Sequence, residues 1–385
     1  QLANTFTDYV FEAVDGQTPT LGDLLMLSKD ISLNNITISN GINYRNFTLL
    51  GDPAMRLAYP QYTVKTTQAP DTIQALEKVT IKGIVTNDYG QKQENYNGIV
   101  YPVIYDQLRQ ITTLDNDNEG DFQYDDRTGI IFNGKAGVKN GEFEFSFVVP
   151  KDINYEFGKA KVSYYTDDRR IDGNGNDLEI TIGGIDENAA EDNTPPDVQL
   201  WMNDENFVSG GITDENPSIY ARVFDESGIN TVGSGIGHDI TAVLDENTGN
   251  PIILNDFYES DLNSYQSGTI NYPFSELDQG RHTLSLKVWD VYNNSAEAYT
   301  EFVVAGSEEL AVEHLLNYPN PFTTNTSFYF EHNAPGQSLE VRIQVFTVSG
   351  KLVKTIDGIH ASDGFRIGPI NWNGRDDYGD AIGKG

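Results

Sequence analysis

From about residue 61 onward, the chain shows an alternation of apolar and polar side chains with a period of two residues. The stretch Glu142–Pro150 reads EFEFSFVVP, which places Phe143, Phe145 and Phe147 on one face and acidic or polar residues on the other. Gly, Asn and Asp separate this run from similar ones such as KVSYYT and LEITIGG. A period of two is that of a β-strand with one buried face, and many short strands joined by turn residues are typical of antiparallel sandwiches. The sequence therefore predicts a mainly β fold of tandem Ig-like sandwiches.

The chain is too long for one ordinary domain. Its 385 residues correspond to two to four domains of about 100–150 residues each. The stretch 186–197, DENAAEDNTPPD, is acidic, lacks periodicity and contains Pro-Pro, which predicts a semi-rigid linker. A second, shorter break is predicted near 305–309. The predicted divisions are a short α/β segment at 1–60 and three β modules at 61–185, 197–305 and 314–385.

Residues 1–60 have a different pattern from the rest. The sequence PTLGDLLMLSKDI predicts a helix that Thr20 caps, with Asp23 three residues later and with Leu24, Leu27 and Ile31 on one side. The stretch 47–60, FTLLGDPAMRLAYP, predicts a buried strand, a Gly-Asp-Pro turn and a short exit strand. One helix and two strands are too few to bury a core of their own. We therefore expect this segment to pack on a preceding domain outside the chain.

Composition restricts the classes of partner. The chain has 58 acidic and 25 basic residues, a formal charge of −33, which repels nucleic acid and anionic membrane surfaces. It has no cysteine, so it holds neither a disulfide nor a cysteine nucleophile. No apolar run approaches the roughly 20 residues that span a bilayer. The first residues, QLANTFTDYVFE, lack the basic start and apolar core of a signal peptide, so we expect any export signal to lie upstream of Gln1.

One motif carries oxygen ligands at alternating positions. The sequence DGNGND at Asp172–Asp177 resembles the front of an EF-hand loop, and it predicts a structural Ca²⁺ site. Gly183 stands where the bidentate Glu of that loop is expected, and Glu179 is a substitute. A plain turn between strands predicts the same residue types, so both interpretations stay open. The candidate ligands are Asp172, Asn174, Asn176 and Asp177.

The histidines and the glycine-rich stretch offer no clear chemistry. No two histidines have H-x-x-x-H or H-x-H spacing, which argues against a histidine-rich metal site, so each is expected to be a surface or turn residue. The stretch Ser227–Asp239 has many glycines but no Lys and no strand-to-helix context, which argues against a nucleotide site. We expect it to be a long loop whose glycines allow its backbone to approach another module or the catalytic domain. The five histidines are His238, His282, His314, His332 and His360.

The last part of the chain contains three motifs in a fixed order. These are NYPNPF at Asn317–Phe322, VRIQVFTVSGKLVKTI at Val341–Ile356 and NWNGRDDYGDAIGKG at Asn371–Gly385. Together they resemble the C-terminal sorting domain of proteins exported by the type IX secretion system of the Bacteroidetes. Domains of that family usually continue into one more apolar strand. The resemblance therefore implies a sandwich whose last strand is missing from the sequence.

Two further regions resemble gingipain-like cysteine peptidases. ANTFTDYVFE, PTLGDLLMLSK and the stretch Gly51–Pro60 resemble the end of their caspase-like catalytic domain, which leads into an Ig-like domain. The stretch Asn203–Leu262 and the later sequence LKVWDVYNNS are similar to the cell-surface sortase branch, the PorU-type sortases. The catalytic Cys and His of that family would lie upstream of Gln1, so no catalytic residue is assigned within the chain. No cofactor is implied.

The resemblance implies a function for the parent protein and a supporting role for this chain. Such sortases remove the C-terminal signals of exported cargo proteins and attach the cargo to anionic lipopolysaccharide at the outer membrane, beside a PorV-like β-barrel. This chain would have no activity itself, but would support the catalytic domain and dock the enzyme at the cell surface. One alternative is a non-enzymatic adhesin or carbohydrate-binding array with a sorting domain. Another is a secreted gingipain-like protease whose terminal domain is removed as cargo.

Overall fold

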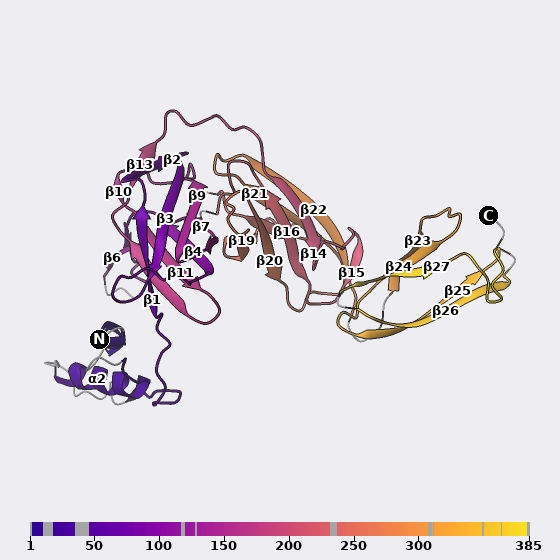
Figure 1. Ribbon diagram of the computed structural model, residues 1–385, viewed down its shortest axis with the longest axis horizontal. Helices are drawn as coiled ribbons and strands as arrows, with labels where there is room; N and C mark the ends of the chain where they lie inside the picture. The colour runs from indigo at the N-terminus through magenta and orange to yellow at the C-terminus, as the bar shows by residue number, and fades with distance from the viewer. Residues whose placement is uncertain are drawn as a thin grey trace. The chain divides into compact units, whose positions relative to one another are not determined.

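The protein is described by a computed structural model and is mainly β, as predicted (Figure 1). The chain divides into two compact units, residues 1–61 and 62–385, which we describe separately. None of the described helices is long and apolar enough to cross a membrane. The structure describes residues 2–10, 18–34, 46–116, 120–127, 129–231, 237–306, 310, 312–348, 350–362 and 364–382.

The described part of the first unit includes the helices α1 (Leu2–Val10) and α2 (Leu21–Asn34), which contact each other. The predicted start of α2 is confirmed. The Asp23 amide donates to the Thr20 hydroxyl at 3.1 Å, and the Thr20 amide donates to the Asp23 carboxylate at 3.3 Å. This reciprocal pair is a capping box, which satisfies amides that the first helical turn leaves without partners. Leu24 is fully buried on this helix.

The stretch 47–60 does not form the predicted strands. Apart from an isolated bridge between Thr20 and Arg56, its described residues have no strand pairing. Leu50 is 96% exposed, so the apolar run lies on the surface of this unit instead of in a core. The turn itself is confirmed, because Asp52 accepts a hydrogen bond from the Ala54 amide at 2.8 Å. An apolar run predicts burial, but a strand also needs a neighbouring strand for its hydrogen bonds.

The first sandwich is built mainly from one sheet in the order β7-β4-β11-β12-β1-β3-β9. β8 pairs with β4 and also contacts β9, so the two ends of this sheet meet around the core. A small sheet, β10-β13-β2, and a hairpin, β5-β6, complete the module. Phe143, Phe145 and Phe147 of β9 are buried as the alternation predicted. The strands are β1 (Tyr62–Gln68), β2 (Thr72–Ala75), β3 (Lys78–Thr86), β4 (Gly98–Tyr105), β5 (Arg109–Thr112), β6 (Gln123–Asp126), β7 (Ile130–Asn133), β8 (Ala136–Val138), β9 (Glu142–Val148), β10 (Gly158–Lys159), β11 (Lys161–Asp167), β12 (Asp172–Asp177) and β13 (Thr181–Ile185).

The second sandwich packs a four-stranded sheet, β14-β16-β20-β19, and a five-stranded sheet, β15-β22-β21-β17-β18, around one core. Met202, Leu286 and Phe302 are among its fully buried side chains. The elements are β14 (Asp197–Met202), β15 (Gly211–Thr213), β16 (Ser218–Phe224), β17 (Thr241–Leu244), β18 (Ile252–Ile253), the 3₁₀-helix η1 (Asn255–Phe257), β19 (Tyr258–Ser260), β20 (Ser267–Pro273), β21 (Gly280–Trp289) and β22 (Ser295–Val304).

The third sandwich is the smallest. It has a three-stranded sheet, β23-β24-β27, and a hairpin, β25-β26, and its buried core consists of Phe330, Ile367 and Ile370. Along β25, exposed and half-buried residues alternate, so no residue of this strand is fully buried. β25 and β26 pair as antiparallel strands, with Phe346 opposite Leu352 at the end nearest their connection. The strands are β23 (Val312–Tyr318), β24 (Thr326–His332), β25 (Ser338–Phe346), β26 (Leu352–Ala361) and β27 (Arg366–Trp372).

Candidate functional site

The first and second sandwiches meet at a polar contact centred on Asp152. This residue follows β9 in the first sandwich, and its carboxylate lies 2.5 Å from the His238 Nδ1 atom of the second. It also accepts hydrogen bonds from the side-chain amides of Asn230 at 3.3 Å and Asn293 at 2.8 Å. In its described parts, the glycine-rich loop therefore contacts the first sandwich through the Asn230 and His238 side chains; residues 232–236 lie outside the described residues.

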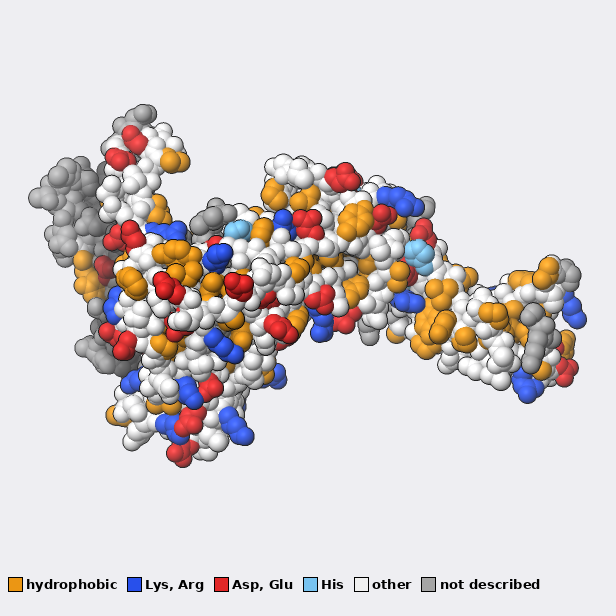
Figure 2. Space-filling model, turned by 90° about the horizontal axis from the view of Figure 1, so that it is seen from above, with side chains coloured by type: hydrophobic (Ala, Val, Ile, Leu, Met, Phe, Trp, Pro, Cys, Tyr) orange, Lys and Arg blue, Asp and Glu red, His pale blue; other side chains and the backbone are white. Residues whose placement is uncertain are grey.

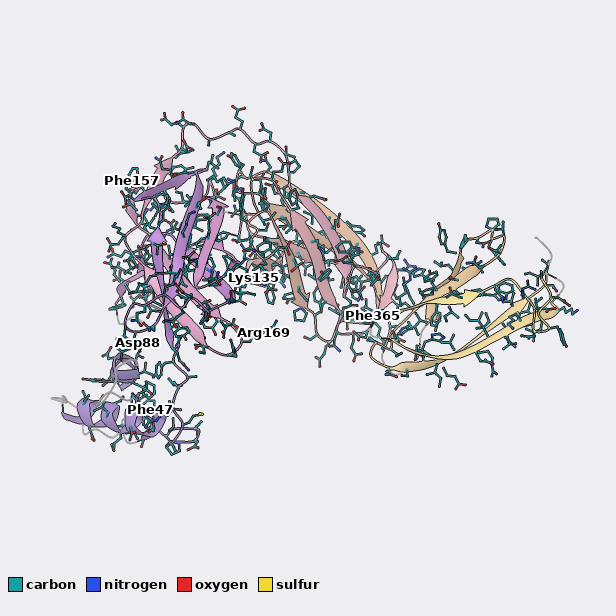
Figure 3. The ribbon with its side chains drawn as sticks, viewed as in Figure 1. Phe47, Asp88, Lys135, Phe157, Arg169 and Phe365 are labelled. Atoms are coloured by element: carbon teal, nitrogen blue, oxygen red, sulfur yellow. The ribbon has the colours of Figure 1, made fainter. Side chains whose placement is uncertain are left out.

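Further pairs join the same two sandwiches. Lys135, labelled in Figure 3, forms an ion pair with Glu259, and the Gly137 amide donates to the Asn263 side chain at 2.8 Å. The Lys151 amide donates to the Val291 carbonyl at 2.9 Å. Because these contacts include backbone as well as side-chain groups, they fix the relative orientation of the two sandwiches.

Three aspartates gather beside this contact. Asp192 belongs to the segment predicted as a linker, Asp225 follows β16, and Asp290 follows β21. One carboxylate oxygen from each lies within 4.8 Å of the others. Asp225 is 4% exposed and Asp290 is fully buried. In the described part of the chain, none of the three forms an ion pair with a basic residue.

Local turns explain why each aspartate holds its place. Every one of them caps a turn with one oxygen, as short acidic side chains do after a strand. Two further hydrogen bonds join the three turns. The Ser227 hydroxyl donates to the Asp192 carboxylate, and the Asn294 side chain, which also donates to Asp290 at 2.7 Å, donates to the Asp192 carbonyl at 3.2 Å. The capping amides are Thr194 for Asp192, Ser227 and Gly228 for Asp225, and Tyr292 and Asn294 for Asp290.

The electrostatics of the cluster follow from its burial. Burial raises the pKa of Asp225 to about 6, and the negative charges of Asp290 and Asp192 add to this, while the turn amides oppose it. Burial likewise raises the pKa of Asp290. Such a cluster can hold a proton near neutral pH, and its oxygens are of the type that a hard cation such as Ca²⁺ binds. In the described structure it fastens the linker to the second sandwich.

The structure does not bring together the four residues of the predicted calcium site, Asp172, Asn174, Asn176 and Asp177. These residues form β12, a strand that pairs with β1 on one side and β11 on the other, instead of a loop or a turn. Asp172, Asn174 and Asn176 lie on one face, and the first and last are about 13 Å apart along an extended strand. Asp177 lies on the opposite face. The four side chains therefore cannot converge on one ion.

The expectation that all histidines are surface or turn residues fails for two of them. His282 is 8% exposed and lies 2.8 Å from a carboxylate oxygen of Asp245. His332 is fully buried, its Nε2 atom lies 2.8 Å from the Ser362 hydroxyl, and burial lowers its pKa. Both have polar partners, which explains why an apolar environment accepts them.

The three aspartates were not identified from the sequence. They lie far apart in the chain, so no spacing connects them, and only the fold brings them together. The available signal is local: Asp225 and Asp290 each follow directly on an alternating strand and precede a turn that contains Gly or Asn. That signal predicts turns and does not distinguish a cluster from unrelated turns.

Comparison with known proteins finds matches to this chain among solved structures. No family model and no curated protein matches it. Among solved structures, dimeric latent PorU from Porphyromonas gingivalis is 31% identical, with 98% of this chain and 36% of that chain covered and a TM-score of 0.41. The fibronectin(III)-like modules of Clostridium thermocellum CbhA are 12% identical, with 66% and 97% covered and a TM-score of 0.19, which carries no argument. The chain spans about a third of the length of PorU, and it is related in sequence to PorU over nearly all of its own length.

Proposed function

We propose that the chain is the supporting and docking part of a cell-surface sortase of type IX secretion. The observation that carries this proposal is the 31% identity to PorU over 98% of the chain. The parent enzyme would be a gingipain-like cysteine peptidase that removes the C-terminal signals of exported cargo and attaches the cargo to anionic lipopolysaccharide. Its nucleophile would lie outside these 385 residues, because they contain no cysteine.

The first unit is proposed to pack on a caspase-like catalytic domain. It exposes several apolar side chains, including Phe47 (labelled in Figure 3), Leu50 and Met55, which are 58%, 96% and 52% exposed. Burying each side chain would contribute about 1.5–3 kcal/mol. Leu24, on the apolar side of α2, is already buried within the described chain. The docking face is therefore assigned to Phe47, Leu50 and Met55.

Hydrogen exchange tests this packing. We expect the amides of residues 47–57 to exchange quickly in this chain and to be protected in the protein that includes the upstream domain. Substituting Leu50→Ser should reduce that protection in the longer protein, whereas Leu262→Ser, an exposed leucine of the second sandwich, should not. Equal protection of residues 47–57 in the two proteins would exclude the proposed contact.

The third sandwich is proposed to dock at the outer membrane through a PorV-like β-barrel. Its surface carries exposed apolar side chains such as Leu315, Tyr318 and Ile359, which are 66%, 69% and 77% exposed (Figure 2). Apolar side chains that gather on an exposed surface are typical of interaction sites. Deleting all residues after Ala311 from the full-length protein should release an active enzyme from the cell surface. Normal surface retention would place the docking element elsewhere.

The proposed chemistry is tested with the parent enzyme and this chain side by side. Without a thiolate, the chain should neither cleave nor ligate peptides, whereas the protein extended upstream should do both. Thiol alkylation should abolish peptide cleavage and ligation by the extended protein. Cleavage by the purified chain, or alkylation-resistant cleavage by the extended protein, would contradict a cysteine mechanism.

A further inference from the structure

One strand of the first sandwich has a sequence that sheet stability does not explain. β12 reads DGNGND, and Gly, Asn and Asp are all depleted in strands. Nevertheless, it lies in the middle of the main sheet, between β11 and β1. The glycines have a packing reason: a Cβ on Gly175 would lie 1.9 Å from the Val64 carbonyl oxygen of β1. Packing gives no comparable reason for the polar residues of β12.

The side chains of Asn174 and Asn176 point away from the core and are exposed. Within the described residues, their amide groups have no hydrogen-bond partner, so each offers free donors and an acceptor to a ligand. Asp172 lies on the same face, and one of its carboxylate oxygens accepts a long hydrogen bond of 3.4 Å from the Tyr165 hydroxyl.

Tyrosines lie beside these polar groups. The strand register places Tyr165 of β11 between Asn174 of β12 and Tyr101 of β4, and places Thr63 of β1 beyond Asn174. The rings of Tyr101 and Tyr165 are 6.2 Å apart, with 32° between their planes, and Tyr165 is 44% exposed. At about 4.8 Å per strand, this row of four side chains extends for about 14 Å across the sheet.

A second feature of the same face extends it. Along β4, Tyr105 lies on the same side of the sheet as Tyr101. The Lys161 ammonium lies 5.8 Å from the centre of the Tyr105 ring. The neighbouring row pairs Ser163 with Asn176. Figure 1 shows β4 and β11 side by side in this sandwich. The face therefore combines aromatic rings with amide, hydroxyl and carboxylate groups on a rigid sheet.

We propose that this face, formed by Tyr101, Tyr165, Asn174 and Asn176, binds a neutral oligosaccharide. Tyrosine rings offer an apolar surface to the C–H groups of a sugar ring, and free amides match adjacent hydroxyls. Asp172 and Asp167 on the same face disfavour an anionic ligand, while a purely apolar ligand would leave the amides unpaired. The proposal requires no peptidase activity, so it is independent of the proposed sortase function.

Calorimetric titration of the whole chain tests the proposal. The probes are cellohexaose, maltohexaose and mannohexaose, with hexagalacturonate as the anionic counterpart. We expect at least one neutral hexasaccharide to bind, and to bind more tightly than hexagalacturonate. Tyr165→Ala and Asn174→Ala should each weaken that binding by about tenfold, whereas Tyr165→Phe, which keeps the ring, should weaken it less.

The matched control is Tyr299→Ala, which removes an exposed strand tyrosine from the second sandwich and should leave the affinity unchanged. Melting temperatures of all variants establish that they are folded. The proposal is overturned if no neutral hexasaccharide binds at millimolar concentration. It is equally overturned if folded Tyr165→Ala binds as tightly as the unaltered chain, or if hexagalacturonate is the preferred ligand.

Discussion

Replacing Asp225 by Asn should stabilise the second sandwich at neutral pH but not in acid. Burial beside Asp290 and Asp192 raises the pKa of Asp225 to about 6 in the folded chain, from an ordinary value of 3.8. The folded state therefore binds this proton more tightly than the unfolded state does. By linkage, the free energy of unfolding falls as the pH rises from about 4 to about 6.

The size of the effect follows from the shift. A change of about 2 pKa units corresponds to about 3 kcal/mol, and this destabilisation is absent below the unfolded-state pKa and fully present above the folded-state pKa. Asparagine keeps the side-chain oxygen that accepts the Ser227 and Gly228 amides, but it carries no charge. Relative to the unaltered chain, the variant should gain up to about 3 kcal/mol between pH 4 and pH 7.5.

Urea denaturation followed by tryptophan fluorescence measures this difference. In a Trp372→Phe background, Trp201 and Trp289 both report on the second sandwich, and EDTA ensures that only protons titrate. Asp214→Asn is the control, because Asp214 caps a similar turn outside the cluster, with the Asn216 amide at 2.9 Å. A stability difference that is constant with pH, or that shrinks as the pH rises, would refute the electrostatic argument.

Three further substitutions test other parts of the fold. Thr20→Ala removes the capping box of α2 and should cost about 1 kcal/mol of stability in the first unit, seen as lost helical circular dichroism. Gly175→Ala forces a methyl group against the β1 backbone and should destabilise the first sandwich by about 1–3 kcal/mol in urea, whereas Gly249→Ala, which meets only ordinary contacts, should cost far less. Asp152→Ala removes a carboxylate that contacts three side chains of the second sandwich, so limited proteolysis near residue 192 should become faster.

Local patterns in the sequence were sufficient to predict much of the fold. The alternation in Glu142–Val148 predicted the buried face of β9, because a period of two needs no information from elsewhere in the chain. The Thr20 cap is likewise decided within three residues. Both predictions were confirmed because the pattern or hydrogen bond that decides them lies among neighbouring residues of the sequence.

Predictions failed where distant residues decide the outcome. β12 has the composition of a turn, but it is a strand because β1 and β11 supply hydrogen bonds on both sides. Its glycines also leave room for the closely approaching backbone of β1. The run at 47–60 has the composition of a strand, and the described chain offers it no neighbour. Neither result could be read from local propensity, since β1 lies about 100 residues before β12 in the sequence and no described strand pairs with the run at 47–60.

The segment predicted as a linker shows the limit of a compositional argument most clearly. Its acidic, non-periodic sequence predicts a spacer that separates two modules. In the structure, however, its Asp192 accepts the Ser227 hydroxyl, and its backbone carbonyl accepts the Asn294 side chain at 3.2 Å. Beside it, Asp152 binds donors of the second sandwich. The acidic residues of this region therefore hold two sandwiches in one orientation. A boundary between domains in the sequence is here a fixed joint in the structure. The pH range in which Asp225 titrates is also the range in which the stability of that joint should change.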